Sequence, residues 1–130
     1  MTFTALFPIF VAVVFLGATL RVITPSAAPS RHRWLAPAAA SLAFFAFSLG
    51  AVLIEGPTGF WVEHTRNLWG NQIWIDLLSA AGIGWYFILP RARTVGVRPR
   101  PWLLAIAATG SIGFLAMAAR VLYLEDRRSS

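Results

Sequence analysis

The sequence predicts an all-α fold, a four-helix transmembrane bundle with a short interfacial helix between its second and third helices. Hydrophobic residues make up 58% of the 130 residues and charged residues only 12%, whereas soluble domains carry about 25% charged residues. The chain also contains four apolar runs of roughly the 20 residues that a helix needs to cross a bilayer. These runs lack the strict alternation of barrel strands, which leaves helices as the spanning structure.

The four runs define a single transmembrane domain over residues 1–130. No positive charge precedes the first run, which favours a retained helix over a cleaved signal peptide. The third run is the shortest and the most polar. The predicted helices cover about residues 3–23, 34–54, 72–89 and 102–124. Small residues in the last two runs predict that these two helices pack closely as an antiparallel hairpin. They include Ala80, Gly84, Thr109 and Gly113.

The charges of the connectors predict the orientation. The net charge is +6, and the arginines of the first and third connectors have no acid beside them. The positive-inside rule places these connectors in the cytoplasm, so both termini face outward (N-out and C-out). We expect their arginines to contact anionic lipid headgroups, or alternatively a soluble partner. They are Arg31, Arg33, Arg91, Arg93, Arg98 and Arg100. They form no basic groove or RNA-binding motif, which argues against nucleic acid as a partner.

Tryptophans mark both expected membrane interfaces. Trp34 and Trp102 begin the second and fourth helices at the same predicted depth, and Trp61 and Trp69 lie in the outward connector. Aromatic side chains with a polar edge are enriched at these depths. We therefore interpret all four as interfacial anchors.

The outward connector, residues 55–76, mixes aromatic and polar residues. Helical spacing would put Glu63, Arg66 and Asn67 on one face, which predicts a short amphipathic helix at the outer interface. Solvated charges on an anchor are the simplest interpretation of this pattern.

Asp76 lies inside an apolar stretch of the third predicted helix, where a carboxylate is costly and needs a partner. Arg120, near the outer end of the fourth predicted helix, would reach a similar depth. We therefore predict an Asp76–Arg120 ion pair, which is either a structural bridge or part of a functional site. Glu55, Asn71 and Tyr123 are candidates to complete its hydrogen bonds.

Few residues suit catalysis. The chain has no cysteine and two histidines, and no cluster has the spacing of a metal site, so no metal is predicted. Glu63, His64 and Asp76 could form an acid–base set. His64 could instead ligate a tetrapyrrole. No cofactor is predicted from a motif, and contact with a carotenoid or a tetrapyrrole stays open.

From Asn71 onward the order of motifs resembles a known group. Asp76-Leu77-Leu78 is followed by an arginine-rich turn, by Trp102 opening an apolar helix with Gly113 inside it, and by a closing Leu122-Tyr123-Leu124 with an acid–arginine tail. Over about residues 71–128 this resembles small four-helix inner-membrane proteins of bacteria that are classed only as a domain of unknown function. Ala118-Ala119-Arg120 departs from the group's apolar pattern. The resemblance implies fold and location and no activity.

These observations favour a non-enzymatic function. We expect a small multi-pass protein of the bacterial inner membrane that holds a partner subunit, a lipid or an apolar pigment. Membrane lipids and either a membrane-protein partner or copies of the chain itself are the expected partners. The alternative is a small membrane enzyme or carrier that acts on an isoprenoid-like lipid through Asp76, Glu63 and His64.

Overall fold

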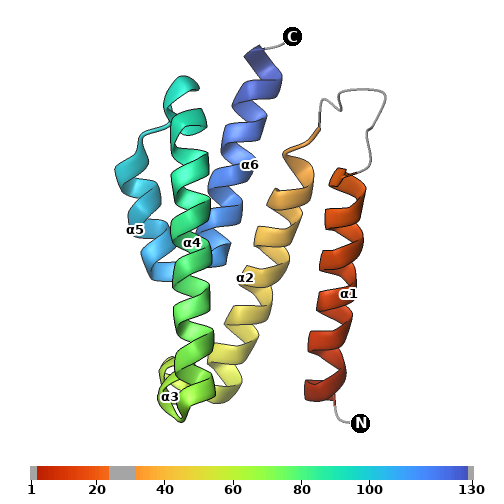
Figure 1. Cartoon of the computed structure of the whole chain (residues 1–130), viewed down its shortest axis with the longest axis vertical. Helices are drawn as coiled ribbons and strands as arrows, with labels where there is room; N and C mark the ends of the chain where they lie inside the picture. The colour runs from red at the N-terminus through yellow and green to blue at the C-terminus, as the bar shows by residue number, and fades with distance from the viewer. Residues whose placement is uncertain (1–2, 24–31, 129–130) are drawn as a thin grey trace. The chain divides into compact units, whose positions relative to one another are not determined.

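The computed structural model of the chain is all-α and describes residues 3–23 and 32–128. Over these residues it contains six helices (Figure 1). They are α1 (Phe3–Ile23), α2 (Leu35–Glu55), α3 (Gly59–Thr65), α4 (Leu68–Thr94), α5 (Pro99–Thr109) and α6 (Ser111–Arg128). The chain divides into two compact units, residues 1–30 with α1 and residues 31–130 with α2 to α6, here called the α2–α6 unit.

The predicted four-helix transmembrane bundle is wrong. Among the described residues, only α2 and α4 are long and apolar enough to cross a membrane. The described apolar part of α1, Leu6–Arg21, is shorter. The run predicted as one helix over 102–124 is divided between α5 and α6. With 11 residues α5 is too short to span a bilayer, and α6 ends in the charged residues 125–128.

The division between α5 and α6 falls at Gly110. Its φ of 60° and ψ of −126° are the mirror image of an extended conformation, which side-chain-bearing residues rarely adopt. The hydroxyl of Thr109 donates to the Ala105 carbonyl at 2.7 Å and accepts from the Gly113 N–H at 3.0 Å, which ties the two helices together. A Cβ on Gly113 would lie 2.8 Å from the Ala105 backbone. The chain therefore reverses here, and α5 and α6 form a hairpin (Figure 1).

This reversal removes the charge separation on which the predicted C-out orientation rests. The carboxyl ends of α4 and α6 and the amino end of α2 all lie at one end of the α2–α6 unit (Figure 1), called here the arginine-rich end. The acids at 125 and 126 therefore lie beside the arginines of the connectors, whereas the sequence placed them on the opposite side.

Helix α6 packs against α2, α4 and α5. Its Phe114 ring packs so closely on α4 that a Cβ on Gly84 would lie 2.7 Å from the ring. Gly84 is thus a close-packing residue, as expected, although its neighbour α6 runs in the same direction as α4. Met117 and Val121 are fully buried. They belong to a core near the arginine-rich end, which contains Ile88, Ala92, Val95, Val97, Ile106, Met117 and Val121.

Helix α4 begins and ends with well-defined caps. The Asn67 side chain accepts a hydrogen bond from the Gly70 N–H at 2.9 Å at the start of the helix. At its end the Val97 N–H donates to the Ala92 carbonyl and the Gly96 N–H to the Arg93 carbonyl, with Gly96 at φ 79°. This pair of bonds is a Schellman motif. It turns the chain toward α5 and buries Val97 in the core.

The connector after α2 does contain a short helix, α3, as the sequence predicted for this segment. Helices α3 and α4 approach closely at Gly70, where a Cβ would lie 2.6 Å from the Glu63 carbonyl oxygen. Any side chain at position 70 would push the two helices apart.

Candidate functional site

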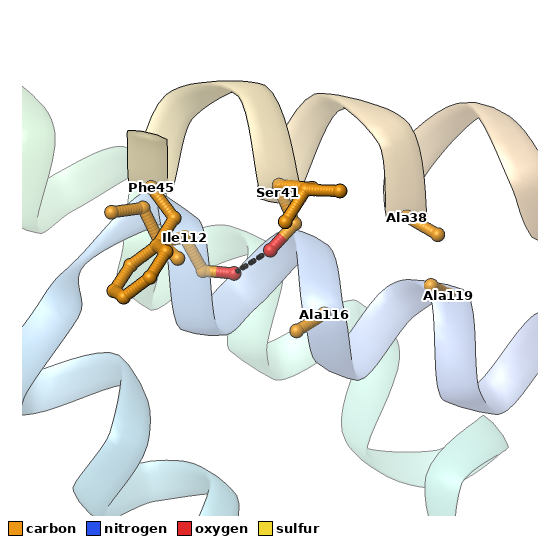
Figure 2. A pocket seen from close by; sticks show the side chains of 7 residues that line it. Ala38, Ser41, Phe45, Ile112, Ala116 and Ala119 are labelled. Atoms are coloured by element: carbon orange, nitrogen blue, oxygen red, sulfur yellow. Dashed lines mark hydrogen bonds between the residues drawn. The ribbon is translucent and has the colours of Figure 1, made fainter. Parts of the chain in front are cut away.

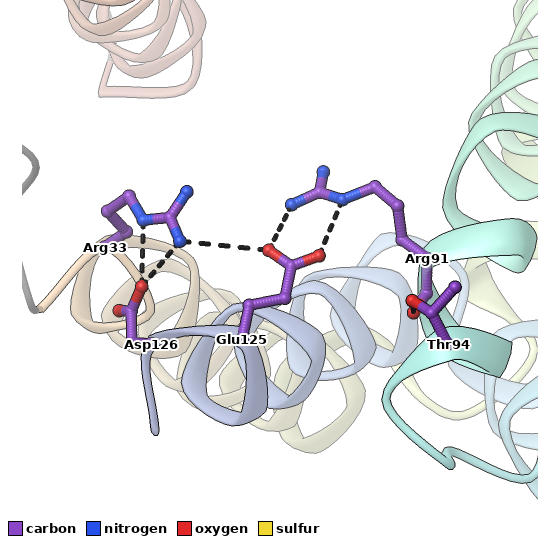
Figure 3. A network of polar contacts seen from close by, with 5 residues as sticks. All are labelled: Arg33, Arg91, Thr94, Glu125 and Asp126. Carbon is purple, nitrogen blue, oxygen red and sulfur yellow. Dashed lines mark hydrogen bonds and ion pairs between the residues drawn. The ribbon is translucent and has the colours of Figure 1, made fainter. Parts of the chain in front are cut away.

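Four charged side chains form a network at the arginine-rich end, here called the acid–arginine network (Figure 3). Arg33, just before α2, donates from Nε and Nη2 to Oδ1 of Asp126 on α6 at 2.9 and 2.6 Å. Arg91 of α4 donates from Nε and Nη2 to the two carboxylate oxygens of Glu125 at 2.9 and 2.7 Å. The Oε2 atom of Glu125 also lies 3.9 Å from Nη2 of Arg33. The network thus joins α2, α4 and α6.

The two acids of the network differ in burial, because the side chain of Asp126 is buried and that of Glu125 is 23% exposed. The Asp126 side chain is 8% exposed, whereas those of Arg33 and Arg91 are about half exposed, at 46% and 51%. Arg33 donates both hydrogen bonds to one oxygen of this buried carboxylate, whereas Arg91 forms a bidentate pair with the two oxygens of Glu125. Both are charge-assisted hydrogen bonds, which are short and strong. We infer that Asp126 holds Arg33 from the protein side while the other side of the guanidinium remains exposed.

The pKa of Glu125 is lowered from its usual value, first by the hydrogen bonds from Arg91 and then by the charges of Arg91 and Arg33, against the opposing effect of partial burial. A carboxyl with a lowered pKa in the folded state stabilises that state above its unfolded pKa, about 4.3, and loses this contribution as the pH falls through the lowered folded value.

We therefore expect the melting temperature of the wild type, relative to that of Glu125→Gln, to be highest at neutral pH. The advantage should shrink as the pH falls below about 4.3. Circular dichroism melts of both proteins in mild detergent between pH 7 and pH 3 measure this difference. An advantage that grew toward acid pH would contradict the assignment.

A second cluster at the arginine-rich end surrounds the ring of Tyr123. The guanidinium carbons of Arg120 and Arg127 lie 5.9 and 5.2 Å from the ring centroid, within cation–π range. The Trp34 ring meets Tyr123 edge-on at 5.5 Å. We call Trp34, Arg120, Tyr123 and Arg127 the cation–aromatic cluster.

An open apolar groove of about 340 Å³ runs between α2 and α6 (Figure 2). Its lining is Ala38, Ser41, Leu42, Phe45, Ile112, Ala116 and Ala119. The hydroxyl of Ser41 is the exception to the apolar lining, and it is buried and donates to the Ile112 carbonyl at 2.9 Å. That donor is satisfied within the protein.

The polar residues that the sequence singled out lie mostly at the opposite end of the unit, around α3. Glu63 pairs with Arg66 at 3.2 Å, three residues apart as expected, and both are well exposed. Asn67 caps α4, and the Asn71 amide donates to the Asn67 carbonyl at 3.0 Å. Glu55 ends α2.

The structure does not bring Glu63, His64 and Asp76 together. The ring centroids of His64 and Trp74 lie 5.5 Å apart. The Nδ1 atom of His64 is 2.5 Å from the carbonyl oxygen of Phe60. Asp76 follows Trp74 by two residues, about 200° around the helix, and therefore faces away from His64. Contact of His64 with a tetrapyrrole stays a prediction. Among the described residues, no three acid or histidine side chains are grouped to hold a metal ion.

Asp76 and Arg120 do not form the predicted ion pair. Within the described part of the chain the Asp76 side chain forms no hydrogen bond or ion pair. Because the chain reverses at Gly110, α6 runs toward the arginine-rich end, and Arg120 lies well beyond the level of Asp76. Tyr123 also lies at that end, where its ring contacts Trp34 and the guanidinium groups of Arg120 and Arg127.

The predicted anchors and headgroup arginines divide between the two ends. Trp61 and Trp69 are exposed around α3, whereas Trp34 and Trp102 are half-buried at the arginine-rich end. Arg33 and Arg91 belong to the acid–arginine network. Arg93, Arg98 and Arg100 are exposed, and Arg31 lies outside the described residues.

Sequence reasoning missed the acid–arginine network and the groove. A signal for the first was present, because the connectors hold arginines without acids and the tail holds Glu125 and Asp126. Because arginines and acids attract each other, these two groups are expected to pair wherever the fold brings the tail close to the connectors. The groove left no such signal, because its alanines resemble any other small residues in an apolar helix.

Comparisons with protein-family models, with curated proteins and with solved structures find no match for this chain.

Proposed function

We propose that this chain is a small integral protein of a bacterial inner membrane that acts as a non-catalytic accessory subunit. Helices α2 and α4 cross the bilayer. The exposed apolar face of α2 contacts a membrane-protein partner, and that of α4 contacts lipid. By the positive-inside rule the arginine-rich end, with the carboxyl end of α6, faces the cytoplasm.

The exposure of apolar side chains on α2 and α4 carries this proposal. Leu53 and Phe44 on α2 are 86% and 42% exposed, and Ile83 on α4 is 62% exposed. Helix α2 carries no charge before Glu55. Soluble monomers rarely expose apolar faces this large, and a bilayer or a partner helix removes them from water. The arginines at one end, among them Arg93, Arg98 and Arg100, suit an anionic leaflet.

A labelling experiment tests the membrane placement. The chain has no cysteine, so Thr58→Cys and Arg98→Cys each introduce a single thiol. We expect both proteins to resist carbonate extraction. A membrane-impermeant maleimide should label Thr58→Cys in intact cells and Arg98→Cys only after permeabilisation. Release by carbonate, or labelling of both from the same side, would contradict the proposal.

The role as a subunit is tested by extraction in mild detergent. We expect a membrane protein to co-elute at a fixed ratio and to be lost from Phe44→Ala/Phe47→Ala, while Ile83→Ala on α4 serves as a control for the loss of an exposed apolar side chain. Co-elution that both variants leave unchanged would argue against this face of α2. The absorbance spectrum of the same preparation tests the predicted carotenoid or tetrapyrrole contact.

A further inference from the structure

We propose that the groove between α2 and α6 binds one phospholipid with an anionic phosphate headgroup. An acyl chain lies along the groove, and the guanidinium groups of Arg120 and Arg127 hold the phosphate. This inference rests on the proposed function, because it requires α2 to lie in a membrane.

The groove is suited to an acyl chain. It forms where small residues of the two helices face each other, with Ala38 on α2 and Ala116 and Ala119 on α6 (Figure 2). Its volume of about 340 Å³ is at the lower end of the range for small-molecule sites, roughly 300–1,000 Å³. The Ser41 hydroxyl already donates to Ile112, so the wall offers apolar contact along its length.

The groove leads to the cation–aromatic cluster. On α6, Tyr123 follows Ala119 by four residues, and on α2, Trp34 precedes Ala38 by four. Residues four apart lie on one face of a helix, and the Trp34–Tyr123 contact joins the two rows. The end of the groove therefore lies at the arginine-rich end, at the level where a headgroup would sit.

The charges at this end complement a phosphate. Arg120 and Arg127 are exposed, and both guanidinium groups converge on the Tyr123 ring although their Cα atoms are about 10 Å apart along the helix. All five acids of the chain lie within the described residues, and none of them forms an ion pair with either arginine. Arg120 follows Ala116 by four residues and Arg127 by eleven, which keeps both on the groove side of α6.

This arrangement favours an anionic phospholipid over the other apolar ligands. Basic pockets between membrane helices on the cytoplasmic side are recognised sites for anionic headgroups, and two guanidinium groups match the oxygens of a phosphate. A choline headgroup would bring its own positive charge close to both arginines, and an uncharged carotenoid would leave them without an anion.

A lipid-binding experiment tests the headgroup. The full chain, purified in mild detergent, is titrated with phosphatidylglycerol and with phosphatidylcholine of the same acyl chains, and the bound lipid is counted by native mass spectrometry. The wild type should prefer phosphatidylglycerol. Arg120→Gln/Arg127→Gln should weaken that binding about 25-fold, about fivefold for each arginine. Arg98→Gln/Arg100→Gln makes the same change in net charge at α5, which does not line the groove, so it measures only the general attraction of anionic headgroups. It should change the affinity for phosphatidylglycerol by at most about threefold.

A second arm tests the groove and separates a lipid from free phosphate. Ala116→Leu fills the groove without changing the charge and should weaken phosphatidylglycerol binding by about tenfold or more. Ala80→Leu, on the exposed surface of α4, is the matched control. Inorganic phosphate at millimolar concentration should compete poorly with the lipid.

Several results would overturn the proposal: equal affinity of the wild type for both lipids, equal effects of the two arginine pairs, or binding that Ala116→Leu leaves unchanged. The lipid comparison uses only the wild type, so it decides even if a variant fails to fold. A chain that resists carbonate extraction but shows no lipid preference refutes this inference alone. A chain that carbonate releases refutes the proposed function.

Discussion

Replacing Asp126 by alanine should lower the free energy of unfolding of the α2–α6 unit by about 2 to 3 kcal/mol. Removing one partner of a buried ion pair costs about 3–5 kcal/mol, because the other charge is left without compensation. Arg33 is 46% exposed and keeps a carboxylate oxygen of Glu125 at 3.9 Å, so water and this second acid offset part of its charge and the expected cost falls below that range. In a circular dichroism melt in mild detergent this corresponds to a decrease on the order of 10 °C.

Glu63→Ala is the matched control for Asp126→Ala. It also removes one carboxylate from an arginine pair, but the Glu63 and Arg66 side chains are 60% and 67% exposed, and such pairs contribute less than about 1 kcal/mol. A double-mutant cycle of Arg33→Ala and Asp126→Ala should give a coupling energy of about 1–3 kcal/mol. If Asp126→Ala melted like Glu63→Ala, the network would not be what holds α2 to α6.

The first two helices were predicted closely from the sequence. The predicted ranges 3–23 and 34–54 agree with α1 and α2 to within one residue. Both segments are uninterrupted apolar runs, and in such runs helix formation depends on local composition. No tertiary contact has to be known in advance.

The third helix was predicted too short, at 72–89 instead of Leu68–Thr94. The predicted helix ends just before Pro90, because proline removes a backbone donor and usually interrupts helices. Here the helix continues for four residues past it, to the Schellman motif at Gly96. Asn67, whose side chain caps the start of α4, was instead assigned to the polar face of the interfacial helix.

The polar residues could be found from the sequence, but their partners could not. Asp76 and Arg120 stand out in apolar surroundings, and a straight helix over 102–124 would have brought them to the same depth. The backbone conformation of Gly110 prevents this, because it reverses the chain between α5 and α6. The Thr109-Gly110-Ser111 triplet is a turn signal, yet glycine is also common in close-packed membrane helices, and composition alone does not separate the two uses.

Gly110→Ala should destabilise the α2–α6 unit by about 1 to 3 kcal/mol, because an alanine at φ 60° and ψ −126° is strained in a region that is almost restricted to glycine. The matched control is Gly82→Ala in α4, where an added Cβ meets no atom within 4 Å. That change should be neutral or stabilising by up to about 1 kcal/mol, since alanine favours a helix interior. Melts of both variants in the same detergent measure the difference.

The alternative for Gly110→Ala is that α5 and α6 straighten into the continuous helix that the sequence suggested. This would relieve the strain, but it would expose Met117 and Val121, which are fully buried, and separate Glu125 and Asp126 from Arg91 and Arg33. Those losses exceed the strain, since burial of one such side chain contributes about 1.5–3 kcal/mol, so we expect the hairpin to persist. In Gly110→Ala, Arg127→Cys should therefore be labelled from the same side of the membrane as Arg98→Cys. Labelling from opposite sides would mean that Gly110 alone determines on which side of the membrane the acid–arginine tail lies.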